Sequence, residues 1–119
     1  TRKKIIIIQS IPEIGYDVPS TDFIATVTNR DTNAIISPSL AEYHKRTNEV
    51  NIIFHQLEIK KSVKIINPSK QLCDTISCKV VIDHTLLYRD DDHLSTYGAK
   101  FISPVFYSAF NQSVQINTD

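Results

Sequence analysis

Four consecutive isoleucines, Ile5 to Ile8, constrain the fold of this 119-residue chain more than any other stretch. Their β-branched side chains favour an extended backbone, and the run shows no alternation of apolar and polar residues. A strand that is apolar on both faces is typical of a central parallel strand covered by helices on each side. The run therefore predicts the interior strand of an α/β sheet.

A loop is expected directly after this strand, over residues 10–21, because the segment carries two prolines and a glycine and has little periodicity. Doubly wound sheets bind their ligands beyond the carboxyl ends of their strands. Pro12, Glu13 and Tyr16 could therefore edge a site, although the alternative favoured for each of them individually is a role in the conformation of the loop alone. Residues 23–27 fit a short strand or a helical turn, and residues 29–37 read as a polar connection.

A long amphipathic helix is predicted over residues 40–60, with Ser39 and Glu42 as a capping box at its start. Its apolar stripe recurs at intervals of four and three residues, and consists of Tyr43, Thr47, Val50, Phe54 and Leu57. His44 and His55 fall off this stripe and are expected to face solvent. A second strand over residues 62–66 would complete a βαβ unit.

Composition excludes several classes of function. Thirteen basic residues balance thirteen acidic ones, so the chain has no overall field to attract nucleic acid or an anionic membrane. No apolar run approaches the roughly 18 residues needed to span a bilayer. The hydrophobic content of 41% is ordinary for one globular domain or part of one.

Three aspartates and a histidine, Asp90 to His93, form the stretch richest in possible chemistry. A carboxylate can fix the tautomer of an imidazole and stabilise its charged form, and Asp90 and His93 have the spacing for such a dyad. The alternative is a solvated turn before a helix that Ser95 caps. Asp91 and Asp92 are expected to be solvated or to lie at this cap, and Ser95 is a poor nucleophile because the cap needs its hydroxyl. His84 lies in a predicted turn between two short extended segments.

Cys73 and Cys78 are the only cysteines, and their spacing is neither a Cys-x-x-Cys redox site nor half of a four-ligand zinc site. Composition leaves two alternatives open, a local disulfide in an oxidising compartment or two free thiols.

Residues 90–99 read Asp90-x-x-His93-Leu94-Ser95-x-x-Gly98-Ala99. This stretch resembles the last sequence block of the SGNH (GDSL-like) hydrolases. More narrowly, this block resembles the version found in SGNH domains fused behind a membrane-embedded acyltransferase-3 domain. Residues 4–19 are similar to the central strand and following loop of that family, and residues 63–68 are similar to its next strand. The resemblance implies a three-layer, flavodoxin-like α/β fold with a parallel sheet flanked by helices. It also implies that Cys73 and Cys78 form a disulfide.

One departure from the family pattern is large. The family takes its nucleophile from a Gly-Asp-Ser block and its oxyanion hole from a further glycine and an asparagine, whereas the only glycines here are Gly15 and Gly98. We therefore expect residues 1–119 to be the C-terminal portion of an SGNH domain, inactive without its serine.

The resemblance implies that Asp90 and His93 belong to the Ser-His-Asp triad of an O-acyltransferase. This enzyme would acylate hydroxyl groups of a cell-surface polysaccharide, without a cofactor. An upstream membrane domain would deliver the acyl group, and the chain would lie at the periplasmic or extracellular face of a bacterial inner membrane. Two alternatives remain open: an SGNH carbohydrate esterase that removes acetyl groups, and a non-catalytic module in which residues 90–93 bind a divalent cation.

Overall fold

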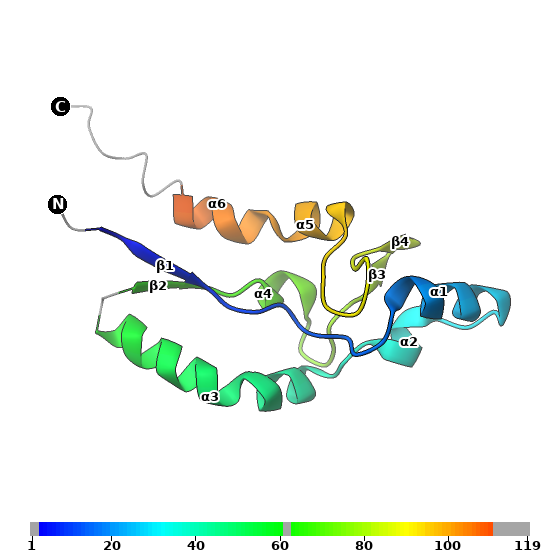
Figure 1. Cartoon of the computed structure of the whole chain (residues 1–119), viewed down its shortest axis with the longest axis horizontal. Coiled ribbons are helices and arrows are strands. Elements are labelled where there is room, and N and C mark those ends of the chain that lie inside the picture. The colour runs from blue at the N-terminus through cyan, green and yellow to red at the C-terminus, as the bar shows by residue number, and fades with distance from the viewer. Residues whose placement is uncertain (1–2, 61–62, 111–119) are drawn as a thin grey trace.

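The computed structural model describes residues 3–60 and 63–110. At its centre, strand β1 (Ile5–Ile8) pairs in parallel with β2 (Val63–Ile66), in a register that joins Ile5 to Val63 and Ile8 to Ile66. Helix α3 (Leu40–Ile59) lies on one side of this pair and α6 (Pro104–Phe110) on the other, as Figure 1 shows. The predicted βαβ unit and the mixed α/β class are thus confirmed.

Strand β1 is less covered than the isoleucine run predicts. Ile5 and Ile8 are 54% and 55% exposed. The two helices pack mainly on β2, and within the described residues β2 is the only strand beside β1. A strand with one neighbour cannot be shielded on both faces along its whole length, so the expectation of a fully covered central strand is wrong for these residues.

Helix α3 begins as predicted. The Ser39 hydroxyl accepts from the Glu42 amide at 3.1 Å, and the Glu42 carboxylate accepts from the Ser39 amide at 3.1 Å. The predicted stripe is correct except at Val50, which is largely exposed. Asn51 faces the sheet instead, because its side-chain oxygen accepts a 2.7 Å hydrogen bond from Gln9 at the end of β1. His44 and His55 are exposed, as expected.

Two helices lie over segments expected to be a loop or a polar connection, and the first of them confirms the helical alternative for residues 23–27. Helix α1 (Val18–Val27) starts at Asp17, whose carboxylate accepts from the Ser20 amide at 3.0 Å, so the loop after β1 ends earlier than predicted. Helix α2 (Thr32–Ile36) occupies the supposed polar connection and is capped by Asp31. Aspartate caps and a few buried side chains stabilise both helices, and a search for long amphipathic patterns misses such short elements.

The chain after β2 is built from small elements. Helix α4 (Ser69–Leu72) is followed by the cysteine loop and by a hairpin of β3 (Val81–Ile82) and β4 (Thr85–Leu86). Asp83 and His84 both have positive φ, as the preferred two-residue hairpin turns require, which confirms the turn. Helix α5 (Thr96–Ile102) then leads into α6, with a break at Ser103-Pro104. Within α5, Gly98 and Ile102 are buried, whereas Tyr97 is exposed.

The buried core lies beyond the carboxyl ends of the two strands rather than around them. It joins the loop after β1, helices α1, α2, α4 and α5, and the hairpin, and its members are Ile14, Val18, Ile36, Leu72, Val80, Leu87, Tyr88 and Ile102. The base of the candidate site, at Tyr88, is therefore part of this core. Among the described helices, none combines the length and the apolar character that crossing a bilayer requires.

Candidate active site: the Asp90–His93 loop

Residues 89–93 form a tight, closed loop between β4 and α5. An antiparallel bridge between Tyr88 and Leu94 closes its base, and the Arg89 amide donates to the His93 carbonyl at 2.9 Å. Tyr88 is fully buried, so the base of the loop is anchored in the core.

Asp90 organises the inside of this loop. Its Oδ1 accepts from the backbone amides of His93 at 2.7 Å and of Asp92 at 3.1 Å. Nδ1 of the His93 imidazole lies 3.2 Å from Oδ1 and 3.0 Å from Oδ2 of the same carboxylate. The structure therefore brings the two predicted site residues into contact, with the geometry of an orienting carboxylate and its imidazole.

Asp92 is a second carboxylate partner that the sequence analysis assigned to solvent or to the helix cap. Its Oδ1 lies 2.7 Å from Nδ1 of His93, although the side chain remains exposed. Asp91 is exposed, and its backbone carbonyl accepts a hydrogen bond from the Ile14 amide at 2.8 Å. The neighbouring position of Asp92 and His93 in the sequence could not reveal this contact, because it depends on how the loop turns.

Hydrogen bonding keeps Asp90 charged. Burial would raise the pKa of the Asp90 carboxyl group, but the backbone amides of His93 and Asp92 and the imidazole of His93 together outweigh this, so its pKa lies below the ordinary value. An ionised carboxylate is the form that can orient an imidazole and stabilise its protonated state.

The carboxylates leave the other ring nitrogen of His93 available. With acceptors at Nδ1, the neutral imidazole carries its proton there, and Nε2 is the basic atom. No residue in the described ranges hydrogen bonds Nε2, and the His93 side chain is 59% exposed. This arrangement can accept a proton from a hydroxyl group brought to the surface of the loop and can later return it.

Ser95 serves the helix, as predicted. Its hydroxyl accepts from the Gly98 amide at 3.0 Å and donates to the Leu86 carbonyl at 2.7 Å. Gly98 in turn lies directly against the Leu87 backbone, where a Cβ atom would collide with the carbonyl oxygen. Ser95 is thus committed to positioning α5 under the loop and is not placed as a nucleophile.

The loop after β1 is fastened to the Asp90–His93 loop. The Ile14 amide donates to the Asp91 carbonyl at 2.8 Å, and the Tyr88 hydroxyl donates to the Pro12 carbonyl at 2.9 Å. On its other side, the Tyr43 hydroxyl of α3 donates to the Ser10 carbonyl at 2.9 Å. Hydrogen bonds therefore connect the segment after β1 to both the dyad loop and α3.

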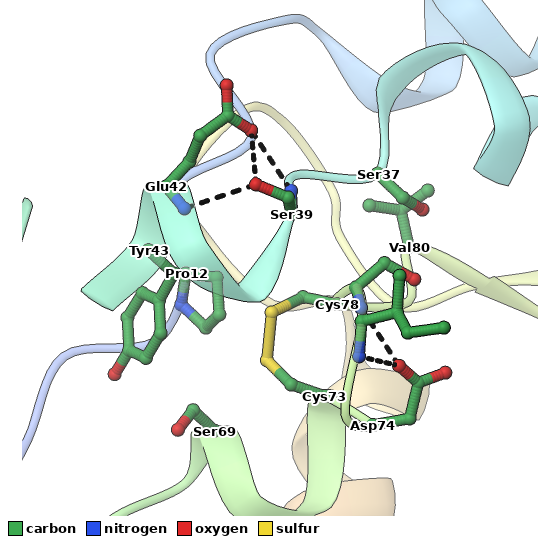
Figure 2. Close-up of a disulfide and its surroundings, with 12 residues drawn as sticks. Pro12, Ser37, Ser39, Glu42, Tyr43, Ser69, Cys73, Asp74, Cys78 and Val80 are labelled. Atoms are coloured by element: carbon green, nitrogen blue, oxygen red, sulfur yellow. Dashed lines mark hydrogen bonds between the residues drawn. A yellow bond between two sulfur atoms is a disulfide. The ribbon is translucent and has the colours of Figure 1, made fainter. Parts of the chain in front are cut away.

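Cys73 and Cys78 are joined by a disulfide, as the resemblance implies (Figure 2). Asp74 closes the turn between them, because its Oδ1 accepts from the amides of Ile76 at 2.7 Å and Ser77 at 2.8 Å. The loop holds the connection between α2 and α3, since the Cys78 amide donates to the Pro38 carbonyl at 3.0 Å.

The comparison with protein families decides the identity of the fold. A family model described as "SGNH domain (fused to AT3 domains)" matches residues 1–108. The chain belongs to this SGNH family. Its flavodoxin-like fold agrees with the parallel strand pair flanked by helices, and fusion to an AT3 (acyltransferase-3) domain implies a membrane acyltransferase partner and a role in acyltransferase or esterase chemistry. No curated protein and no solved structure matches the chain.

Proposed function

We propose that this SGNH chain supplies the histidine and aspartate of an O-acyltransferase that acylates hydroxyl groups of a cell-surface polysaccharide. The observation that carries the proposal is the contact between His93 Nδ1 and the ionised Asp90 carboxylate, with Nε2 left exposed. Asp90 holds the ring and remains ionised, and His93 moves the proton.

The reaction has two halves, and the same proton acceptor serves both. In the first, Nε2 of His93 takes the proton of a serine hydroxyl as the serine oxygen attacks the carbonyl of the acyl donor, and then protonates the departing group. In the second, Nε2 takes the proton of a glycan hydroxyl, whose oxygen attacks the acyl-serine. The ester moves to the glycan, and the proton returns to the serine oxygen.

The serine is proposed to come from polypeptide that precedes residue 1 in the domain, which makes residues 1–119 its C-terminal portion. Two observations support this assignment. The sequence contains no Gly-Asp-Ser block, and the hydroxyl of Ser95, the serine nearest to His93 in sequence, is bound to Leu86 and Gly98. The AT3 partner would deliver the acyl group, which places the site on the periplasmic or extracellular side of the membrane.

Acyl transfer by the AT3-fused protein tests the dyad. His93→Ala should reduce transfer to the polysaccharide by about 10³-fold or more, because triad residues act as a unit. His84→Ala is the matched control, since His84 is an exposed histidine in the hairpin turn and should leave transfer unchanged. Equal activity of the two variants would rule out His93 as the base.

The isolated chain tests the missing nucleophile. Residues 1–119 should not hydrolyse a chromogenic acetyl ester faster than buffer. Turnover that disappears in His93→Ala would instead show that the nucleophile lies within these residues, and the C-terminal-portion assignment would be wrong.

A carbohydrate esterase is the nearest alternative, because the same dyad can deliver the acyl group to water. Product analysis separates the two reactions: an esterase releases free acetate from an acetylated glycan, whereas a transferase gives a newly acylated glycan. Membrane spans encoded upstream would favour transfer, and a signal peptide alone would favour the esterase.

A divalent-cation module is the second alternative, because ligand atoms of Asp90, Asp92 and His93 lie within 4.8 Å of one another. Calorimetric titration of the chain with Ca²⁺ discriminates the two roles. Heat of binding that vanishes in Asp92→Asn, while acyl transfer by the full protein survives His93→Ala, would favour the cation module.

A further inference from the structure

A hollow beside the loop after β1 has no role in the proposed proton transfers. It lies between the loop after β1, the end of α2 and the first turns of α3, and has a volume of about 300 Å³. This is the lower end of the range for sites that bind small molecules. Its floor is apolar, formed by Ile14, Ile36 and Pro38, and its rim carries Glu13, Tyr16 and Arg46.

The hollow is joined directly to the dyad loop. Ile14, which lines its floor, is buried, and the Ile14 amide donates to the carbonyl of Asp91 at 2.8 Å. A molecule seated in the hollow therefore touches a residue that is hydrogen bonded to the loop of Asp90 and His93. The hollow is thus linked to the dyad loop through one backbone hydrogen bond.

The polar groups on the rim include both signs of charge. Arg46 Nη1 lies 3.8 Å from Glu13 Oε2, and the two side chains are 61% and 68% exposed, so neither is committed to a buried contact. Glu42 uses Oε2 in the capping box with Ser39, and its Oε1 points away from these bonds in Figure 2. Two carboxylates and one guanidinium offer both acceptors and donors without a strong field, which suits a neutral molecule rich in hydroxyl groups.

Tyr16 supplies the remaining element of such a site. Its ring is 65% exposed at the edge of the hollow. An aromatic face can cover the C–H face of a pyranose while the charged groups bind its hydroxyls, since an amphipathic ring matches an amphipathic ligand.

The wall of the hollow is rigid before any ligand arrives. The capping box fixes the start of α3, and the cysteine loop binds the neighbouring backbone through hydrogen bonds from Cys78 to Pro38 and from Leu40 to Ile76. Figure 2 shows the disulfide, the capping box and Tyr43 close together at this wall. Preorganisation of this kind reduces the entropy lost on binding.

From these observations we infer that the hollow lined by Glu13, Tyr16, Glu42 and Arg46 binds a neutral sugar unit of the acceptor polysaccharide. The inference rests on the proposed function for the choice of acceptor, but the binding itself requires no catalysis. It assigns to this chain a part in selecting the glycan, in addition to its part in moving protons.

Saturation-transfer NMR on the 119-residue chain tests the inference. The probes are neutral trisaccharides of glucose, galactose, mannose and N-acetylglucosamine, each at millimolar concentration, and trigalacturonate as the acidic counterpart. At least one neutral probe should receive saturation and bind more tightly than trigalacturonate. Binding of none of the neutral probes, or preference for trigalacturonate, would overturn the inference.

Variants locate the binding. Tyr16→Ala and Arg46→Ala should each weaken binding about tenfold, the loss typical of removing a tyrosine or arginine anchor. Tyr16→Phe should bind as the unchanged chain does, because the ring face is retained. Tyr107→Ala is the control, since Tyr107 is similarly exposed on α6 and does not line the hollow. Binding that is insensitive to Tyr16→Ala and Arg46→Ala would contradict this location.

The result is separable from the proposed catalytic role. His93→Ala should leave saccharide binding unchanged while abolishing acyl transfer by the AT3-fused protein. If saccharides bind but the AT3-fused protein transfers no acyl group, the proposed function is wrong and the sugar site stands. If the protein transfers acyl groups but no saccharide binds in the hollow, the sugar site is wrong and the proposed function stands.

Discussion

The hydroxyl group of Tyr88 donates a 2.9 Å hydrogen bond to the carbonyl oxygen of Pro12. Both residues are fully buried, and they are separated by 76 positions in the sequence. Burial raises the pKa of the Tyr88 hydroxyl far above its ordinary value, with a smaller contribution from Tyr43, so the group stays protonated and remains a donor. The bond therefore fixes the loop after β1 to the base of the Asp90–His93 loop at all physiological pH values.

Removal of this donor should destabilise the protein. Tyr88→Phe keeps the ring but leaves the buried Pro12 carbonyl without its partner, and we expect the free energy of unfolding to fall by about 1–3 kcal/mol. Urea denaturation followed by circular dichroism measures the change. Tyr107→Phe changes an exposed ring on α6 and should have almost no effect. Equal losses in the two variants would show that the Tyr88 hydrogen bond does not stabilise the protein.

A methyl group at Gly98 should be poorly tolerated. Its Cβ would collide with the Leu87 carbonyl, which belongs to backbone and cannot turn aside, so Gly98→Ala should cost about 1–3 kcal/mol or more. Gly15→Ala is the comparison, because Gly15 has φ of 80° but no atom within 4 Å of the added Cβ. That variant should lose only about 1 kcal/mol from backbone strain. The reverse order of the two losses would contradict the close packing of α5.

The charge of Asp90 should stabilise the folded chain in a pH-dependent way. Its pKa is lower in the folded protein than the ordinary value of 3.8, so its contribution is fully present above that value and is lost as the pH falls through the lower, folded-state pKa. Asp90→Asn removes the charge and keeps an oxygen in place. The difference in unfolding free energy between the original chain and this variant should thus be constant near neutral pH and shrink below about pH 4.

Urea denaturation over a series of pH values measures this difference. Asp83→Asn is the control, because the Asp83 carboxylate makes no hydrogen bond within the part of the chain that the structure describes. An Asp90→Asn difference that is unchanged down to about pH 2 would show that the carboxylate charge does not stabilise the loop.

Loss of the disulfide should weaken the molecule at the α2–α3 connection. Replacing both Cys73 and Cys78 by serine removes a short cross-link, for which the chain-entropy argument gives about 2 kcal/mol. Thermal denaturation with and without dithiothreitol measures the effect. The reductant should lower the melting temperature of the original chain and leave the double variant unchanged; an effect on both would mean that the reductant acts elsewhere.

The sequence was most informative where a local pattern decides the structure. The capping box of Ser39 and Glu42 and the cap at Ser95 each depend on residues three positions apart, and both are present as predicted. The Asp90–His93 contact is of the same kind, since a spacing of three within a closed loop brings the side chains together. These features need little information from the rest of the chain.

Features that depend on distant packing could not be predicted. Asn33 was assigned to a polar connection, yet its side chain accepts from the Val80 amide at 2.9 Å and donates to the Val81 carbonyl at 2.9 Å, and so fastens α2 to the hairpin. Arg46 could not be predicted as part of a site, because a lone arginine on a helix has no local signal. It gains significance only when the fold places it 3.8 Å from Glu13 beside the hollow.

The pairing of β1 with β2 has a consequence for the order of folding. Its partners, Ile5 with Val63 and Ile8 with Ile66, are separated in the chain by the whole of α1, α2 and α3. Bringing them together costs a large loop-closure entropy before any ladder bond forms, whereas α3, the cysteine turn and the β3–β4 hairpin need only local contacts. The sheet at the centre of the architecture is therefore expected to form late, on a scaffold of helix and hairpin that is already in place.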